Sequence, residues 1–159
     1  MIDLIKSYIK CLLNSTNEHG VHSPFVFDLI TKCFHDKTIY PEYNVLKNYR
    51  KSLLENKNTI EVTDFGAGSR IFKSNNREIA KIAQTAGISS KNAELLFRIT
   101  HYFQPKNILE IGTSLGLATS ALSSGNQNAE VISLEGCPQT LNQGQLQLQK
   151  FNFNNVQCL

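Results

Sequence analysis

One stretch near the middle of the chain, residues 107–123, constrains the possible folds more strongly than its surroundings. An apolar segment, Asn107 to Ile111, predicts a short strand, and it runs directly into two glycines, Gly112 and Gly116. The residues at 115–124 then have the apolar spacing of a helix. Strand, glycine turn and helix in this order are typical of an α/β sheet whose backbone approaches a nucleotide-like ligand.

Each glycine has a physical role in such a turn. Gly112 lets the chain leave the strand sharply, because glycine has no Cβ to forbid positive φ. Gly116 is expected to let a ligand or the strand approach the first helical turn, whose backbone N–H groups lack helical partners. Two acids flank this turn: Glu110 precedes it, and Glu135 ends the next apolar run, residues 130–135. A carboxylate about 20 residues beyond the glycines is placed to accept both hydroxyls of a ribose.

The glycine spacing discriminates between nucleotide ligands. A dinucleotide fingerprint beginning at Gly112 needs two further glycines where this chain has Ser114 and Leu117. The observed order, Glu-x-Gly-x-x-x-Gly, resembles instead motif I of the class I S-adenosylmethionine-dependent methyltransferases. The phrase from Leu109 to Thr119 is most similar to that of the small-molecule O-methyltransferases of the catechol and caffeoyl-CoA type.

This resemblance implies a cofactor, S-adenosylmethionine, and a set of residues around it. By position, Glu110 would lie near the amino group of the cofactor, the glycine turn beneath it, and Glu135 at its ribose. Where catechol-type enzymes often have a serine near the cofactor carboxylate, this chain has Ala118. The complete expected set of cofactor-binding residues is Glu110, Gly112, Thr113, Ser114, Gly116, Thr119 and Glu135. No catalytic residue and no metal ligand is assigned.

The element pattern around the turn predicts a parallel sheet. Strands are expected at 107–111, 130–135 and 156–159, joined by helices at 115–124 and 138–150. The expected fold class is α/β: an N-terminal helical region followed by the first half of a Rossmann-like parallel sheet, which is a truncated class I methyltransferase fold. The expected regions are a helical region at 1–58, a short strand and glycine loop at 59–76, and the Rossmann-like half-domain at 77–159.

The residues before the sheet also carry recognisable signals. Helices are expected at 2–13, at 23–34 with Ser23 as N-cap before Pro24, and at 41–55. A strand at 59–65 then leads into a glycine loop, Gly66 to Arg70, which we interpret as an ordinary loop and, if functional, as a substrate lid.

Two further helices, 77–85 and 90–103, are separated by a break around Gly87. Their spacing also fits a helix-turn-helix, with Lys91, Asn92 and Arg98 on the second helix. The preferred interpretation is a helix pair that packs on the sheet, because no basic arm accompanies it.

Composition limits the remaining possibilities. The chain has 159 residues with 41% hydrophobic and 18% charged residues, and its net charge of +3 is modest. No apolar run is long enough for a transmembrane helix, no signal-peptide order is present, and four scattered cysteines indicate reduced thiols. We therefore expect a cytoplasmic protein that does not bind a membrane or, in the preferred interpretation, nucleic acid. Residues 19–27 resemble the N-terminal region of bacterial methyltransferase-like proteins, and this resemblance implies a bacterial source.

The sequence-based hypothesis is a methyltransferase that acts on a small-molecule acceptor, at oxygen by its resemblance. The class I methyltransferase fold that the chain resembles has seven strands and this chain supplies three at most, so the resemblance implies an inactive piece of a protein of about 220–260 residues. The unpaired edge of the first parallel strand predicts a homo-oligomer or a strand-exchanged dimer. Two alternatives stay open: a helix-turn-helix DNA-binding regulator and an NAD-dependent Rossmann enzyme.

Overall fold

The computed structural model describes residues 2–15, 18–20, 22–65, 68–69 and 71–159. The chain divides into two compact units, Met1–Lys37 and Thr38–Leu159, and each is described by itself. The region boundaries predicted after residues 58 and 76 stay predictions. Every helix among the described residues is too short or too polar to cross a bilayer.

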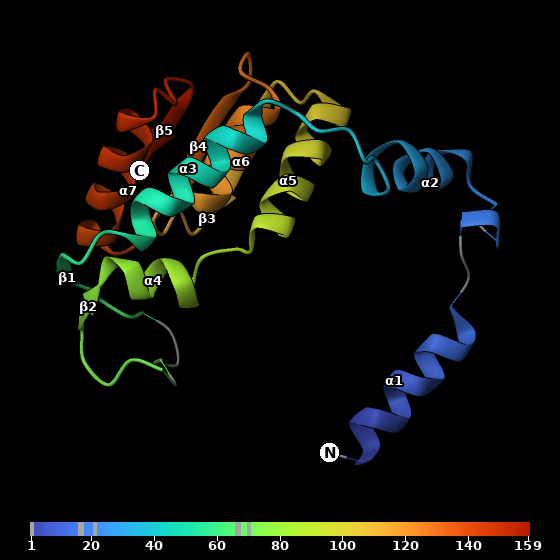
Figure 1. Ribbon diagram of the computed structural model, residues 1–159, viewed down its shortest axis with the longest axis horizontal. Helices are drawn as coiled ribbons and strands as arrows, with labels where there is room; N and C mark the ends of the chain where they lie inside the picture. Colours follow the sequence, from blue (N-terminus) through green and yellow to red (C-terminus); the bar gives the residue numbers. More distant parts are fainter. Residues whose placement is uncertain (1, 16–17, 21, 66–67, 70) are drawn as a thin grey trace. The chain divides into compact units, whose positions relative to one another are not determined.

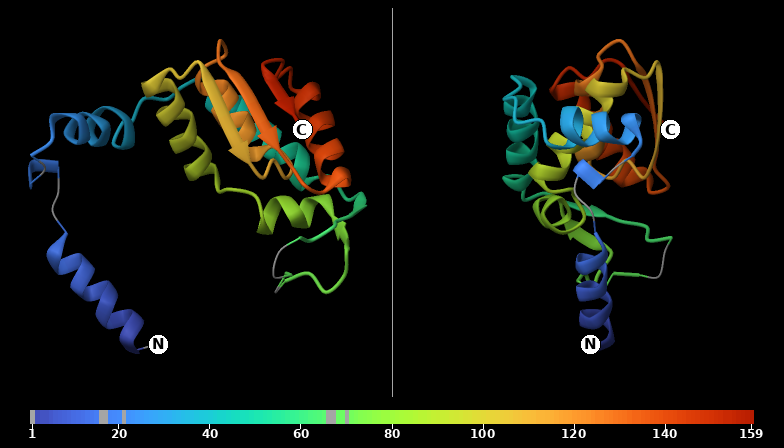
Figure 2. Two further views of the ribbon diagram at one scale, coloured as in Figure 1. Left: turned by 180° about the vertical axis from the view of Figure 1, so that it is seen from behind. Right: turned by 90° about the vertical axis from the view of Figure 1, so that its right-hand side faces the viewer.

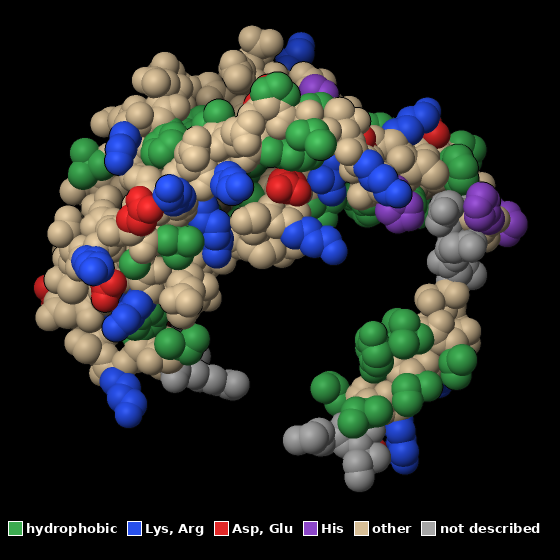
Figure 3. Space-filling model, in the orientation of Figure 1, with side chains coloured by type: hydrophobic (Ala, Val, Ile, Leu, Met, Phe, Trp, Pro, Cys, Tyr) green, Lys and Arg blue, Asp and Glu red, His purple; other side chains and the backbone are tan. Residues whose placement is uncertain are grey.

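The first unit consists of short helical segments (Figure 1). They are α1 (Ile2–Asn14), a 3-10 turn η1 (Glu18–Gly20), α2 (Pro24–Leu29) and a π-helical segment η2 (Ile30–Phe34). The predicted start of α2 is confirmed, because the Ser23 hydroxyl accepts a hydrogen bond from the N–H of Val26 and Pro24 takes the first helical position. The apolar side chains of Ile5, Ile9, Leu12 and Leu13 on α1 are solvent-exposed, and hydrophobic side chains gather along the helix in Figure 3.

The second unit is built on a three-stranded parallel sheet. Its strands β3 (Asn107–Ile111), β4 (Glu130–Leu134) and β5 (Val156–Cys158) lie in that order. Helix α6 (Leu117–Gly125) joins the first two strands and α7 (Pro138–Lys150) the last two. The predicted alternation of strands and helices is confirmed, and β3 is an edge strand of this sheet within the described residues.

The helices of this unit gather on one face of the sheet (Figure 2). Alternation along β3 decides which side chains face them: Ile108 and Glu110 are half-buried, whereas Leu109 and Ile111 are 65% and 83% exposed. No helix among the described residues of Thr38–Leu159 covers the opposite, apolar face.

Helix α3 (Glu42–Leu54) connects the two parts of the core. Its Tyr49 and Leu53 pack with Ile79 and Leu148 in one cluster, and its Leu46 packs with the helices around Phe97 in another. Burial of these apolar side chains is the main stabilising contribution to the unit.

A small antiparallel hairpin lies beside this core and was not predicted in full. Strand β1 (Thr59–Glu61) pairs with β2 (Asn76–Glu78), so that Thr59 lies opposite Glu78. The predicted start of a helix at Arg77 is wrong, because α4 begins only at Ile79 (Ile79–Thr85). Within the predicted glycine loop, residues 66, 67 and 70 lie outside the described residues.

Helices α4 and α5 (Ser90–Phe103) match the predicted helix pair. Their arrangement does not favour DNA recognition, because α5 packs along α6 and buries Ala93, Phe97 and Thr100. The Arg98 guanidinium donates a 3.2 Å hydrogen bond to the Tyr43 hydroxyl and is thereby engaged within the unit. The helix pair therefore serves as a packing layer of the sheet domain.

Candidate functional site

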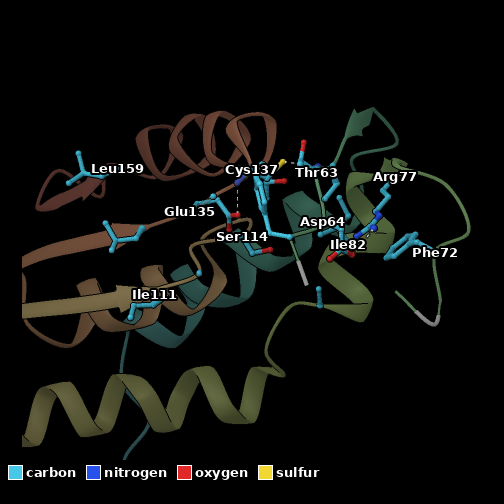
Figure 4. A pocket seen from close by; sticks show the side chains of 17 residues that line it. Thr63, Asp64, Phe72, Arg77, Ile82, Ile111, Ser114, Glu135, Cys137 and Leu159 are labelled. Carbon is cyan, nitrogen blue, oxygen red and sulfur yellow. Dashed lines mark hydrogen bonds and ion pairs between the residues drawn. The ribbon is translucent and has the colours of Figure 1, made fainter. Parts of the chain in front are cut away.

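A cavity of about 680 Å³ opens at the carboxyl ends of β3 and β4. The strand ends contribute Gly112, Ser114 and Glu135 to its lining, and the segments of the β1–β2 hairpin contribute a second wall (Figure 4). Open α/β sheets bind their ligands at this position, beyond the carboxyl ends of the strands. The cavity therefore lies where the sequence analysis expected a ligand.

Glu135 follows β4, and its carboxylate is fixed by two backbone groups. One carboxylate oxygen accepts a 2.8 Å hydrogen bond from the N–H of Ser114, and the other accepts a 3.0 Å bond from the N–H of Cys137. Each carboxylate oxygen has a further lone pair. Glu135 is thus held at the cavity with one acceptor position per oxygen still available for a ligand hydroxyl.

The turn after β3 exposes two of its residues to the cavity, Gly112 and Ser114. Gly112 has φ of +97°, and a Cβ at this position would meet no atom within 4 Å. Ser114 has φ of +49°, which aims its N–H at Glu135. The open space above Gly112 is what a ligand lying on the turn requires.

Backbone N–H groups of the same turn are used inside the protein. The N–H groups of Gly112 and Thr113 both donate to the Leu134 carbonyl, at 2.7 and 3.0 Å. Gly116 donates to Thr113. These donors stabilise the turn, so the ligand-facing side of the site consists of Gly112, Ser114 and Glu135 rather than the first turn of α6.

Gly116 has a packing role that the sequence did not disclose. Its φ is +76°, and a Cβ on this residue would collide with the Tyr49 hydroxyl and would lie 3.2 Å from Leu148. The missing side chain of Gly116 therefore allows α3 and α7, rather than a ligand, to pack closely against this turn. Gly116 does not line the cavity.

Glu110 belongs to a hydrogen-bonded network on the covered face of the sheet. Its carboxylate accepts 2.5 Å hydrogen bonds from the hydroxyls of Thr119 and Ser133, and the Ser133 hydroxyl lies 2.6 Å from that of Thr113. Thr113, Thr119 and Ser133 are almost fully buried. None of Glu110, Thr113 and Thr119 lines the cavity, so their expected contact with a cofactor stays a prediction.

Burial dominates the electrostatics of this network. It raises the pKa of Glu110, and the hydrogen bonds from Ser133 and Thr119 offset only part of that effect. Cys158 lies in register with Ser133 on the neighbouring strand. Burial, and then the charge of Glu110, raises the pKa of its thiol. Burying this polar network beneath the turn costs desolvation free energy, and the hydrogen bonds among its members offset part of that cost.

Thr140 and Cys137 also line the cavity, and neither was selected from the sequence. Thr140 in α7 is only 5% exposed, and its hydroxyl has no hydrogen-bond partner among the described residues. The hydroxyl can donate to the Cys137 sulfur once that thiol is ionised, and it thereby contributes to the lowered pKa of Cys137. A buried hydroxyl without a partner is costly, so Thr140 is available to a ligand.

Cys137 precedes α7 and is buried beside the hairpin. Its sulfur accepts a 3.3 Å hydrogen bond from the N–H of Thr63. Burial raises the pKa of this thiol, but nearby donor groups of Thr140, Thr63 and Gln139 outweigh that effect, so the pKa is lowered overall. The position before Pro138 was the only sequence signal for this residue, and it indicated a helix start rather than a ligand.

The hairpin wall of the cavity is held by an ion pair. Arg77 in β2 forms a 3.1 Å salt bridge with Asp64, and its guanidinium lies 4.9 Å from the centre of the Phe72 ring. Figure 4 shows Asp64, Phe72 and Arg77 on the hairpin side of the cavity. They fix the hairpin segments that face Glu135.

Comparison with known proteins supports the fold assignment. No protein-family model matches the sequence, and no curated protein matches it. Among solved structures, it is similar to the SAH-bound methyltransferase PaMTH1 of Podospora anserina, with 15% identity and a TM-score of 0.52 over 92% of this chain. It is also similar to cofactor-bound Rv0187 from MTB, with 19% identity and a TM-score of 0.47 over 81% of this chain.

The chain spans about half the length of these structures, 52% and 49% respectively. At this level of identity, the similarity to PaMTH1 concerns the fold. The predicted class is confirmed: the chain has an α/β, Rossmann-like methyltransferase fold of which it contains roughly one half.

Proposed function

We propose that this chain is the cofactor-binding half of an S-adenosylmethionine-dependent methyltransferase that acts on a small-molecule acceptor. The observation that carries the proposal is the Glu135 carboxylate, oriented by the N–H groups of Ser114 and Cys137 beside the open Gly112. A methyl acceptor at oxygen is part of the proposal, and it rests on the likeness of residues 109–119 to the catechol-type O-methyltransferases.

The residues at the cavity fit a nucleoside-containing cofactor. The carboxylate of Glu135 has room for two ribose hydroxyls, and Gly112 leaves the space in which the methionine portion would lie. The partnerless Thr140 hydroxyl supplies a further polar group on the same cavity. The apolar side chains of Leu134 and Ile111 complete the floor.

This geometry indicates what the cofactor would supply and what the residues of the chain would contribute. When bound, S-adenosylmethionine supplies an already activated methyl group, so that a protein contributes mainly by orientation. In this chain Glu135 would bind and orient the ribose, and the Gly112–Ser114 turn would support the neighbouring part of the cofactor. The β1–β2 hairpin would shield that side of the site from water.

A dinucleotide is a poorer match to the same turn. Leu117, at the position of the third fingerprint glycine, is a buried apolar residue of the α6 core. Gly112 is followed by Ser114 rather than a second glycine, so a pyrophosphate would lack a close backbone approach. We therefore favour methyl transfer over an NAD-dependent reaction as the function of this site.

The proposal is tested by calorimetric titration of S-adenosylhomocysteine (SAH) into the chain, with NADH as the competing ligand class. Glu135→Gln keeps one oxygen acceptor but removes the charge, and Glu135→Ala removes both. The matched control is Glu130→Ala, because Glu130 is an exposed carboxylate at the opposite end of the same strand.

We expect SAH to bind in preference to NADH and Glu135→Ala to weaken binding at least tenfold, which corresponds to about 1.4 kcal/mol. Glu130→Ala should bind like the wild-type chain. Binding of NADH in preference to SAH, or equal SAH affinity for the Glu135 and Glu130 variants, would contradict the proposal. Circular dichroism of each variant verifies that the fold is retained.

A further inference from the structure

A second cavity, of about 630 Å³, adjoins the cavity at the strand ends. It lies between the hairpin residues 71–78 and helix α4. Phe72 and Arg77 line both cavities and form the boundary between them. Figure 4 shows these two side chains at the hairpin side of the first cavity. A ligand that extends past Phe72 and Arg77 from the first cavity therefore enters the second.

Cationic side chains predominate in the second cavity. Among the described residues its lining contains Lys73, Arg77 and Lys81 but a single carboxylate, that of Glu78. Lys81 lies 3.8 Å from Glu78 in a largely exposed pair, which neutralises little in water. Asp64, the ion-pair partner of Arg77, lines the first cavity and not the second. The second cavity therefore favours an anionic ligand.

Arg77 is held in place with donors to spare. Its side chain is 12% exposed, and its Nη2 donates to Asp64 at 3.1 Å while its Nε donates to the Ser74 carbonyl at 3.4 Å. A guanidinium has five N–H donors, and those that remain have no partner among the described residues. Unpaired buried donors are costly. A carboxylate or phosphate satisfies such a planar fork with two parallel hydrogen bonds.

Lys73 supplies a second cation to the same cavity. It forms no ion pair or hydrogen bond within the described part of the chain. The adjacent Ser74 hydroxyl accepts a 3.1 Å hydrogen bond from the N–H of Asn76 and keeps its own proton for a ligand. Ile71 and Phe72 add apolar surface beside these groups. The lining thus suits a small molecule with an apolar body and an acidic end.

We propose that the second cavity binds the acidic end of the methyl acceptor, and that Arg77 and Lys73 select an acceptor that carries a carboxylate or a phosphate. The inference rests on the proposed function, because it assigns the acceptor to the space that adjoins the cofactor cavity. It names the acceptor class, which neither Glu135 nor the glycine turn specifies.

The charge requirement is tested with three probes of similar size. Protocatechuate carries a carboxylate, phenyl phosphate carries a phosphate, and protocatechuamide is the neutral counterpart of the first. Calorimetric titration of each into the wild-type chain should give at least tenfold tighter binding of one or both anions than of the amide. Rising NaCl concentration should weaken binding of the anions and leave that of the amide unchanged. Comparison of the two anions identifies the acidic group.

Substitutions assign the preference to the second cavity. Lys73→Glu should weaken binding of the preferred anion about tenfold and leave binding of the amide in place. Lys57→Glu is the matched control, because Lys57 is an exposed lysine just before β1 that lines neither cavity. Arg77→Lys keeps the charge but loses the planar fork, so it should also weaken the anion. Circular dichroism verifies that each variant is folded, and the exposed Lys73 is the site at which a change disturbs packing least.

SAH titrations of the same variants separate this inference from the proposed function. Lys73→Glu should bind SAH like the wild-type chain, because Lys73 lies outside the first cavity. No preference for either anion over the amide, or equal weakening by Lys73→Glu and Lys57→Glu, would overturn the anion site even where SAH binds. Anion binding that depends on Lys73 in a chain that does not bind SAH would overturn the proposed function, and with it the role of this cavity in methyl transfer.

Discussion

The hydroxyl of Tyr49 occupies the space that a side chain on Gly116 would need. Tyr49 is fully buried in α3 and donates a 2.8 Å hydrogen bond to the carbonyl of Leu115, the residue just before Gly116. Burial raises the pKa of this hydroxyl, so it remains a protonated donor. The second glycine of the motif is thereby tied to a helix 66 residues earlier in the chain.

We predict that Gly116→Ala lowers the free energy of unfolding by about 3 kcal/mol, from strained positive φ together with overpacking. Gly112→Ala is the matched control, because Gly112 also has positive φ but open space around it, and it should cost only about 1 kcal/mol. Urea denaturation of both variants measures the difference. Equal losses would show that the contact with Tyr49 has no energetic weight.

The same contact predicts coupling between the two residues. Tyr49→Phe removes the colliding oxygen and the hydrogen bond to Leu115, which should cost about 1 kcal/mol. The double variant Tyr49→Phe/Gly116→Ala should then lose about 1 kcal/mol less than the sum of the single losses, because residues in contact are not additive. Strict additivity in the urea series would count against the collision.

The helices and strands of the sheet unit could be predicted because their signals are local. Ser89 caps α5 by accepting a hydrogen bond from Asn92, and Pro138 begins α7, so both helices start where the sequence indicates. The polar triplet Asn76–Glu78 has no such signal. It is a strand only because β1 pairs with it, and that pairing joins residues 15 to 19 positions apart in the chain, such as Thr59 and Glu78.

The candidate site was only partly predictable for a related reason. The order of residues places Gly112, Ser114 and Glu135 at strand ends, and the structure brings these three together at the cavity. Strand alternation puts Glu110 on the same face as Ile108, but the sequence does not disclose which face the helices cover. The contributions of Thr140 and Arg77 arise from tertiary contacts between segments that are distant in the chain.

The buried Glu110 predicts a pH-dependent stability. Because its pKa is raised in the folded protein, the folded state retains a proton over a range in which the unfolded chain has lost it. Stability should therefore decrease as pH rises from the ordinary carboxyl range through the raised pKa of Glu110. Glu110→Gln, which cannot ionise, should flatten this decrease and be more stable than wild type at the high end of the range.

Denaturation midpoints between pH 4 and pH 8 measure this effect. Glu130→Gln removes an exposed carboxylate from the neighbouring strand and should leave the pH profile of the wild-type chain in place. A profile that is unchanged by Glu110→Gln would mean that burial does not control the protonation of this carboxyl group.

The lowered pKa of Cys137 predicts that its thiolate forms at lower pH than that of an ordinary thiol. A lower pKa produces thiolate at lower pH, and thiolate is the nucleophilic form. Alkylation of Cys137 by iodoacetamide, followed by peptide mass spectrometry, should therefore begin at lower pH than that of Cys158, whose pKa is raised. Thr140→Val removes one stabilising donor and should shift the Cys137 profile to higher pH.

Ligand protection adds a functional readout to the same measurement. Cys137 lines the cavity, so SAH should slow its alkylation and leave that of the exposed Cys11 unchanged. Faster alkylation of Cys158 than of Cys137 at low pH would contradict the predicted order of the two thiols.

The uncovered face and edge of the sheet predict association of two copies of this chain. Strand β3 is unpaired on its outer side within the described residues, and Leu109 and Ile111 expose apolar side chains beside that edge. An exposed, apolar edge strand favours pairing with another chain.

Sedimentation velocity should therefore show an increase in mass with protein concentration. Ile111→Lys should suppress it because a charge on the edge strand disfavours pairing, whereas Ile39→Lys, at an exposed residue outside the sheet, should not. A constant monomer mass at high concentration, or equal suppression by both variants, would argue that this edge does not mediate association.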